Sequence, residues 1–152
     1  MHIFKLSLYY AVSVLIVYTL ASAAHTQQVL SRLLQLNVQI EMRDRLMMFA
    51  GDWAGLYLYL IVIALVLLIA FLMIAIIGHF VLTSVPAPIL FAIGGALAML
   101  CMLLTMRELA SLTPIAGARG APGLTLQCLA GAAGGAVFGF ALSRNRLVKS
   151  TA

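Results

Sequence analysis

Residues 54–82 read AGLYLYLIVIALVLLIAFLMIAIIGHFVL, and no Asp, Glu, Lys or Arg interrupts them. A helix rises about 1.5 Å per residue and the hydrocarbon core of a bilayer is about 30 Å thick, so this stretch is long enough to cross a membrane. We predict that it forms a transmembrane helix.

Three more uncharged apolar stretches flank it, at residues 4–24, 85–106 and 124–143, with Lys5 as a single charge at an edge. Hydrophobic residues make up 64% of the chain and charged residues 9%, against about 45–50% and 25% in a soluble domain. The expected fold is therefore an all-α integral membrane protein. We expect one membrane domain over residues 1–152, with four transmembrane helices in a bundle and an amphipathic helix in the first, outer loop.

The link before residue 54 carries that amphipathic pattern. Its apolar residues recur at helical spacings, with Arg43 interrupting: Val29, Leu33, Leu36, Ile40 and Met47. We predict a helix over residues 27–49, either continuing the first span or starting at Thr26 as its N-cap. A second strip of Leu30, Leu34 and Val38 is more than one bundle needs to bury, so it is a candidate docking surface. The alternative is a helix that packs on its own bundle or lies passively on the membrane.

The entry into the second span is rich in aromatic residues. Trp53, Tyr57 and Tyr59 combine an apolar ring with a polar edge, so we expect them at the membrane interface. Asp52 is expected to cap the first turn of the span that follows.

The fourth span contains the most specific packing pattern. Gly131, Gly135 and Gly139 recur every four residues, a glycine zipper that lets another helix approach closely. The third span offers a matching small surface that includes Gly94 and Gly95. We expect this groove to join the third and fourth spans of one chain, and the alternative is a face for self-association.

Proline and glycine mark the other two links. Pro86 and Pro88 disfavour helix at the residues before them, so residues 83–88 are expected to form a tight turn between antiparallel spans. Residues 107–123 are rich in Gly, Ala and Pro and are typical of an ordered loop. Arg119 in this loop is a candidate contact for a lipid headgroup or another anion.

Residues that carry chemistry are few. Ion-coupled transporters usually place ionisable residues inside the membrane, and these four spans have none in their interiors. His25 and His79 fall at opposite ends of their spans, which disfavours haem ligation, and Cys101 and Cys128 form no C-x-x-C motif. We expect no catalytic residue, no cofactor and no metal site.

The cations indicate an orientation. They crowd both terminal segments, at Lys5, Arg144, Arg146 and Lys149. By the positive-inside rule we expect both termini in the cytoplasm, in a bacterial inner membrane. Ala21-Ser22-Ala23 resembles a signal-peptide cleavage site, but the apolar run is at the long limit for a signal, so we expect a retained first span.

Two functions remain open. The first is a non-catalytic accessory or assembly subunit of a larger membrane complex, docked by the first-loop helix. The second is a small self-assembling pore or uncharged-solute channel built around the glycine-rich fourth span, although a pore should show a polar stripe. The expected partners are the lipid bilayer and a larger complex or a second copy of the chain. No nucleic acid is expected, because the net charge of +5 is scattered and not interleaved with aromatic residues.

Overall fold

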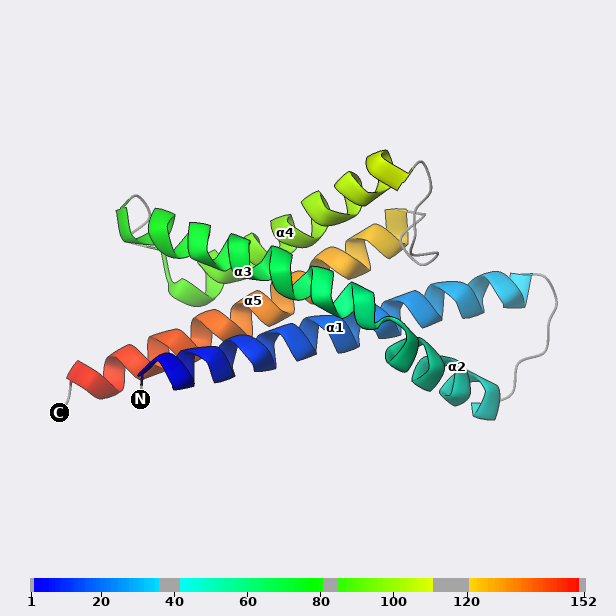
Figure 1. Ribbon diagram of the computed structural model, residues 1–152, viewed down its shortest axis with the longest axis horizontal. Helices are drawn as coiled ribbons and strands as arrows, with labels where there is room; N and C mark the ends of the chain where they lie inside the picture. Colours follow the sequence, from blue (N-terminus) through cyan, green and yellow to red (C-terminus); the bar gives the residue numbers. More distant parts are fainter. Residues whose placement is uncertain (1, 36–41, 81–84, 111–120, 151–152) are drawn as a thin grey trace.

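The computed structural model describes residues 2–35, 42–80, 85–110 and 121–150, and its regular structure there is helical, without a strand. The helices in chain order are α1 His2–Gln35, α2 Met42–Gly55, α3 Tyr57–Phe80, α4 Ala87–Ala110 and α5 Ala121–Ser150 (Figure 1). All of them except α2 are long and apolar enough to cross a membrane. The prediction of four long apolar helices is confirmed.

The helices pack in a chain of neighbours. α4 and α5 lie side by side over most of their length, α1 packs along α5, and α3 crosses above them to contact α4 and α1 (Figure 1). α1 begins and α5 ends at the same end of the molecule, which we call the terminal end. An even number of spanning helices produces this arrangement.

The core lies where α3 crosses α1, α4 and α5. Phe71 of α3 stacks on Phe138 of α5 with ring centroids 4.7 Å apart, and Phe91 of α4 meets both rings edge-on at 5.4 and 5.1 Å. Aromatic pairs in these geometries add about 0.5–1.5 kcal/mol beyond the area that they bury. The cluster therefore fixes the crossing of α3 over the other helices.

The outer face of α3 is left uncovered by the rest of the chain. Its large apolar side chains are more than half exposed along the whole helix, at Leu58, Ile61, Leu65, Ile69, Leu72, Met73 and Ile76. Water would oppose so large an apolar surface, whereas hydrocarbon accepts it. This face agrees with a helix that faces lipid.

α1 and α2 extend beyond the other helices. α1 has 34 residues and is therefore about 51 Å long, roughly 20 Å more than the hydrocarbon core. α2 runs back beside its far half and meets α3 at Leu56, whose backbone N–H donates to the carbonyl oxygen of Asp52 at 2.9 Å. We call residues 26–35 of α1 together with α2 the arm (Figure 1).

The arm corrects the prediction of one loop helix over residues 27–49. α1 runs through Thr26 without a break and ends at Gln35, and α2 is a separate helix. The reason is local, because no Gly or Pro lies between His2 and Gln35 to stop the first helix. Thr26 is therefore not an N-cap, and Asp52 lies inside α2 rather than capping the second span.

The other two links are shorter than predicted. α4 already begins at Ala87, because Pro88 in the first turn of a helix loses no backbone hydrogen bond. The carbonyl oxygen of Pro86 accepts from the N–H groups of Ile89 and Leu90. Residues 107–110 belong to α4 and 121–123 to α5. Residues 81–84 and 111–120, and with them Arg119, lie outside the described part of the chain.

Candidate functional site

Polar side chains gather where α1 meets its neighbours. Ser13 and Ser22 are fully buried and Thr26 is 4% exposed. The Ser13 hydroxyl donates to the carbonyl oxygen of Gly134 on α5 at 2.6 Å. Tyr10 donates in the same way to the carbonyl of Ala64 on α3. The hydroxyls of Tyr10 and Ser13 thus tie α1 to two other helices. We call the polar residues along α1, together with Tyr59 and Gln127 of the neighbouring helices, the polar seam.

Gln127 is the centre of the polar seam. It is fully buried on α5, and its Nε2 donates to the carbonyl oxygen of Ala21 on α1 at 3.0 Å. The Tyr59 hydroxyl of α3 donates to its Oε1, also at 3.0 Å. One amide thus joins three helices. Tyr59 is only 5% exposed because it packs inside the protein, whereas Trp53 and Tyr57 are exposed, and the expected depth of all three at the membrane interface stays a prediction.

The seam continues outward and holds the base of the arm. Tyr18 donates to the carbonyl of Trp53, and the two rings lie 5.7 Å apart. The Thr26 hydroxyl donates to Asp52 Oδ2 at 2.8 Å. α2 is therefore attached to α1 by polar contacts at its carboxyl-terminal end.

The polar residues of the seam form hydrogen bonds that join helices. Each of its hydrogen-bonded hydroxyls gives its proton to a carbonyl, amide or carboxylate oxygen. Ser22 Oγ is the one buried side-chain oxygen or nitrogen without a hydrogen-bond partner among the described residues. Over the same ranges, no three His, Cys, Asp or Glu side chains form a group that could hold a metal ion. Cys101, which is exposed, and Cys128, which is half-buried, are free thiols.

Sequence reasoning missed the seam, although a signal was present. The polar positions of α1 recur at spacings of three to five residues, close to the helical period: Tyr10, Ser13, Tyr18, Ser22 and Thr26. The pattern marks an inward-facing side of the helix. Its partners could not be found in this way, because most of them are backbone carbonyls, which every residue carries.

The glycine row of α5 packs against α4 of the same chain. A Cβ atom on Gly139 would stand 2.6 Å from the carbonyl oxygen of Ala87, and one on Gly135 would stand 3.1 Å from the Cα of Ala92. Gly131 faces Gly95 so closely that neither could carry a side chain. Gly94 does not join this contact.

Gly94 belongs to a different helix contact. A Cβ atom there would meet the side chain of Ile74 on α3 at 2.6 Å. The two adjacent glycines of α4 therefore serve two neighbours, α3 through Gly94 and α5 through Gly95.

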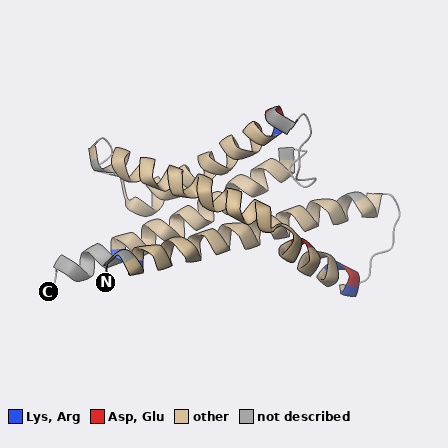
Figure 2. Cartoon of the chain, viewed as in Figure 1, with Lys and Arg blue, Asp and Glu red and all other residues tan. Residues whose placement is uncertain are grey.

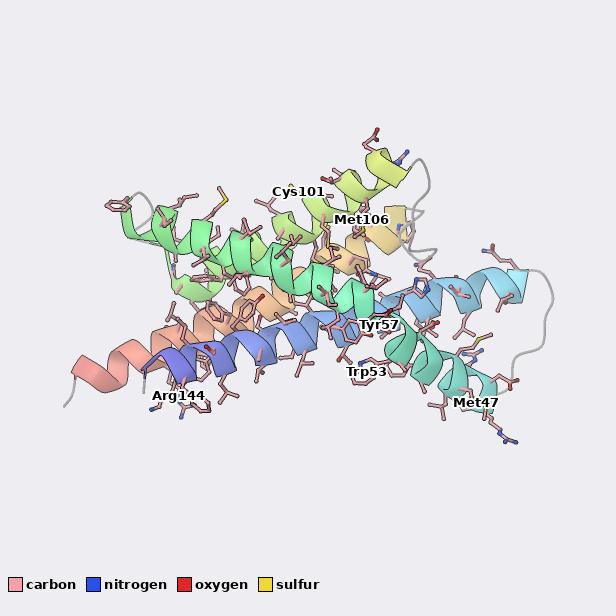
Figure 3. All side chains as sticks on the ribbon, in the orientation of Figure 1. Met47, Trp53, Tyr57, Cys101, Met106 and Arg144 are labelled. Atoms are coloured by element: carbon pink, nitrogen blue, oxygen red, sulfur yellow. The ribbon has the colours of Figure 1, made fainter. Side chains whose placement is uncertain are left out.

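α2 is a helix with no residue buried within the described structure. Met42 is 72%, Leu46 64% and Met47 60% exposed, and the side that meets α1 carries the half-buried Phe49 and Asp52. Figure 3 shows Met47 toward the far end of the arm and Trp53 near its base. The spacings of four and seven residues place Met42, Leu46 and Trp53 on one side of the helix, which also carries Phe49 and borders the contact with α1, where Trp53 packs on Tyr18. We call these three residues the α2 stripe.

The α2 stripe differs from the docking strip that the sequence indicated. Leu30 is 3% exposed and covered by its own chain, so it is not available to a partner. The side chain of Leu34 and all of Val38 lie outside the described part of the structure. The apolar surface that the arm does expose is on α2.

Comparison of the chain with protein-family models, with curated proteins and with solved structures gives no match. We therefore infer the function from the seam, the glycine contacts and the α2 stripe.

Proposed function

We propose that this protein is a small non-catalytic accessory or assembly subunit of a larger membrane protein complex. It packs through its transmembrane helices and docks by the α2 stripe. The observation that supports this function best is the exposed stripe itself, on a helix that lies outside the four apolar spans.

The geometry of the arm favours a protein partner over lipid for the stripe. α2 is paired with α1, and α1 continues straight out of its membrane-spanning part. At about 1.5 Å per residue, Met42 lies roughly 16 Å farther from the base of the arm than Trp53. A helix on the membrane surface would keep both residues at headgroup depth. Met and Leu held away from lipid need a partner to cover them, and flexible Met side chains suit such contacts.

We place the protein in a bacterial inner membrane, with the terminal end in the cytoplasm and the arm outside. All four acidic residues of the chain lie in links or beside them, at Glu41, Asp44, Asp52 and Glu108. Figure 2 shows the red segments away from the terminal end, and blue segments both at that end and beside the red ones. The positive-inside rule counts Lys and Arg near the ends of spans; the cations of the terminal end abut their spans, while those of the arm lie among Glu41, Asp44 and Asp52.

The pore alternative has less support. The glycine row that suggested it is covered by α4, and the seam is filled by side chains that bond to each other or to the backbone. Neither feature offers a surface on which copies of α5 would assemble.

The test is co-purification of the full chain in gentle detergent, with mass spectrometry of what is recovered. We expect the unmodified protein to bring down a larger membrane protein in fixed stoichiometry. Leu46→Glu should abolish this recovery, because an unpaired charge at a closely packed apolar contact costs several kcal/mol. Gln35→Glu is the matched control, since it adds the same side chain to an exposed position of α1 in the same arm.

Both variants should elute as folded monomers, because both positions are exposed. Unchanged recovery with Leu46→Glu would refute docking by the α2 stripe. A homo-oligomer that conducts ions in liposomes would overturn the subunit function altogether.

A further inference from the structure

A cavity of about 340 Å³ lies between α1 and α3 in the half of the molecule near the terminal end. Its walls are almost entirely apolar, and they include Leu6, Tyr10, Leu68, Phe71, Ala75 and Leu142. Two wall residues carry a hydroxyl, Ser7 and Tyr10, and the Tyr10 hydroxyl already donates to the carbonyl oxygen of Ala64. The volume falls in the range of about 300–1,000 Å³ that is typical of small-molecule sites.

The cavity follows from the way in which the helices diverge. α1 and α3 are joined by the Tyr10 hydrogen bond and separate toward the terminal end (Figure 1). Phe91 of α4 and Phe138 of α5 close the inner side of the gap. α1 and α3 are both apolar enough to span a membrane, so the open side of the cavity faces hydrocarbon. An acyl chain is the molecule that this environment supplies.

Two cations stand at the same end as this cavity. Lys5 directly precedes the wall residue Leu6, and Arg144 lies two positions beyond the wall residue Leu142, at the same end of α5 but on another side of the helix. Both cationic side chains are exposed, and Arg144 is labelled near the start of α1 in Figure 3. The chain has no acidic residue before Glu41 or after Glu108 to compete for them. The terminal end thus offers positive charge beside an apolar cavity.

We propose that this place is a binding site for one anionic phospholipid. An acyl chain fills the cavity between α1 and α3, and the phosphate of the headgroup binds Lys5 and Arg144. The charge decides for an anionic lipid over a zwitterionic one, because each basic residue near a membrane surface favours anionic lipid about fivefold. The site is independent of the arm, which lies at the opposite end.

The test is native mass spectrometry of the full chain, released from mixed micelles that hold equal amounts of phosphatidylglycerol and phosphatidylcholine. We expect one retained phosphatidylglycerol, preferred at least tenfold over phosphatidylcholine. Replacing both cations, Lys5→Gln with Arg144→Gln, should remove the preference. Arg43→Gln with Arg107→Gln is the matched control, because it removes the same charge from two exposed positions away from the cavity and should keep the preference.

A second variant tests the cavity. Ala75→Phe fills it from an exposed wall position and should abolish the retained lipid while the charges stay in place. Equal retention of both lipids by the unmodified protein would overturn the proposal. So would a preference that survives loss of Lys5 and Arg144, or lipid that persists in Ala75→Phe. Cross-linking of a cavity residue to a second polypeptide would instead assign the cavity to a partner helix and refute the lipid site.

Discussion

Gln127 joins three helices through its hydrogen bonds, and its replacement is expected to lower the stability of the fold. Gln127→Leu keeps the size of the side chain but leaves the Tyr59 hydroxyl and the Ala21 carbonyl without their partner. We expect a loss of about 1–2 kcal/mol in the free energy of unfolding, near the upper end measured for hydrogen bonds between membrane helices. Unfolding in sodium dodecyl sulfate checks this. Gln27→Leu, at an exposed position of α1, should change nothing beyond error.

Replacing a glycine by alanine is expected to change stability in opposite directions at Gly135 and at Gly51, because their surroundings differ. Gly135→Ala places a Cβ atom against the backbone of Phe91 and Ala92, which cannot rotate away, so α4 and α5 must separate. Overpacking typically costs about 1–3 kcal/mol, and Gly135→Leu should reach the upper end. Gly51→Ala in α2 meets nothing within 4 Å and should stabilise its helix by up to about 1 kcal/mol. Thermal unfolding of both variants in one detergent measures the contrast, and equal shifts would refute the close contact.

At the scale of the element, the arm depends on the contact between α1 and α2. Thr26→Val keeps the branched shape of the side chain and removes the hydroxyl that donates to Asp52. We expect amide hydrogen exchange in α2 to become about fivefold faster, corresponding to a loss of about 1 kcal/mol. Thr19→Val is the control, because the Thr19 hydroxyl is exposed and bonds only within its own helix, to the carbonyl of Leu15. If α2 exchanges at the same rate in both variants, the hydrogen bond does not hold the arm.

α1 is the element whose extent the sequence predicted least well. Its apolar stretch ends near residue 24 and polar residues follow, so the sequence left open whether the first helix continues past Thr26 or a separate loop helix starts there. The structure keeps one helix through Gln35. No Gly or Pro interrupts the sequence from His2 to Gln35, and packing of the far half of α1 against α2 adds to this local preference for helix.

For the whole molecule, we expect the four apolar helices to span the membrane and to place the arm and the terminal end on its opposite sides. Single cysteines at Gln35→Cys and Arg144→Cys, in a chain with Cys101→Ala and Cys128→Ala, test this with a membrane-impermeant thiol reagent. We expect the two positions to react from opposite sides of sealed vesicles. Labelling of both from the same side would show that the number of spans is not four.

The structure differs in part from the predicted packing and docking residues, because it shows which neighbour each side of a helix meets. The spacing of Gly131, Gly135 and Gly139 predicted a close contact with the third span, and the fold packs these glycines against α4. The spacing of Leu30 predicts a place on a docking strip, yet the structure buries this residue. Helical period shows which residues share a side of a helix, but not which side meets protein and which meets lipid.

The sequence by itself determined that the chain forms four long apolar helices. Uncharged stretches such as residues 54–82 must satisfy their backbone hydrogen bonds internally when they enter hydrocarbon, and a helix does so whatever its neighbours are. Only the tertiary structure decided the seam around Gln127, the exposure of α2 and the cavity between α1 and α3. These features depend on contacts between residues far apart in the chain, and in an apolar environment hydrophobicity does not distinguish one such contact from another.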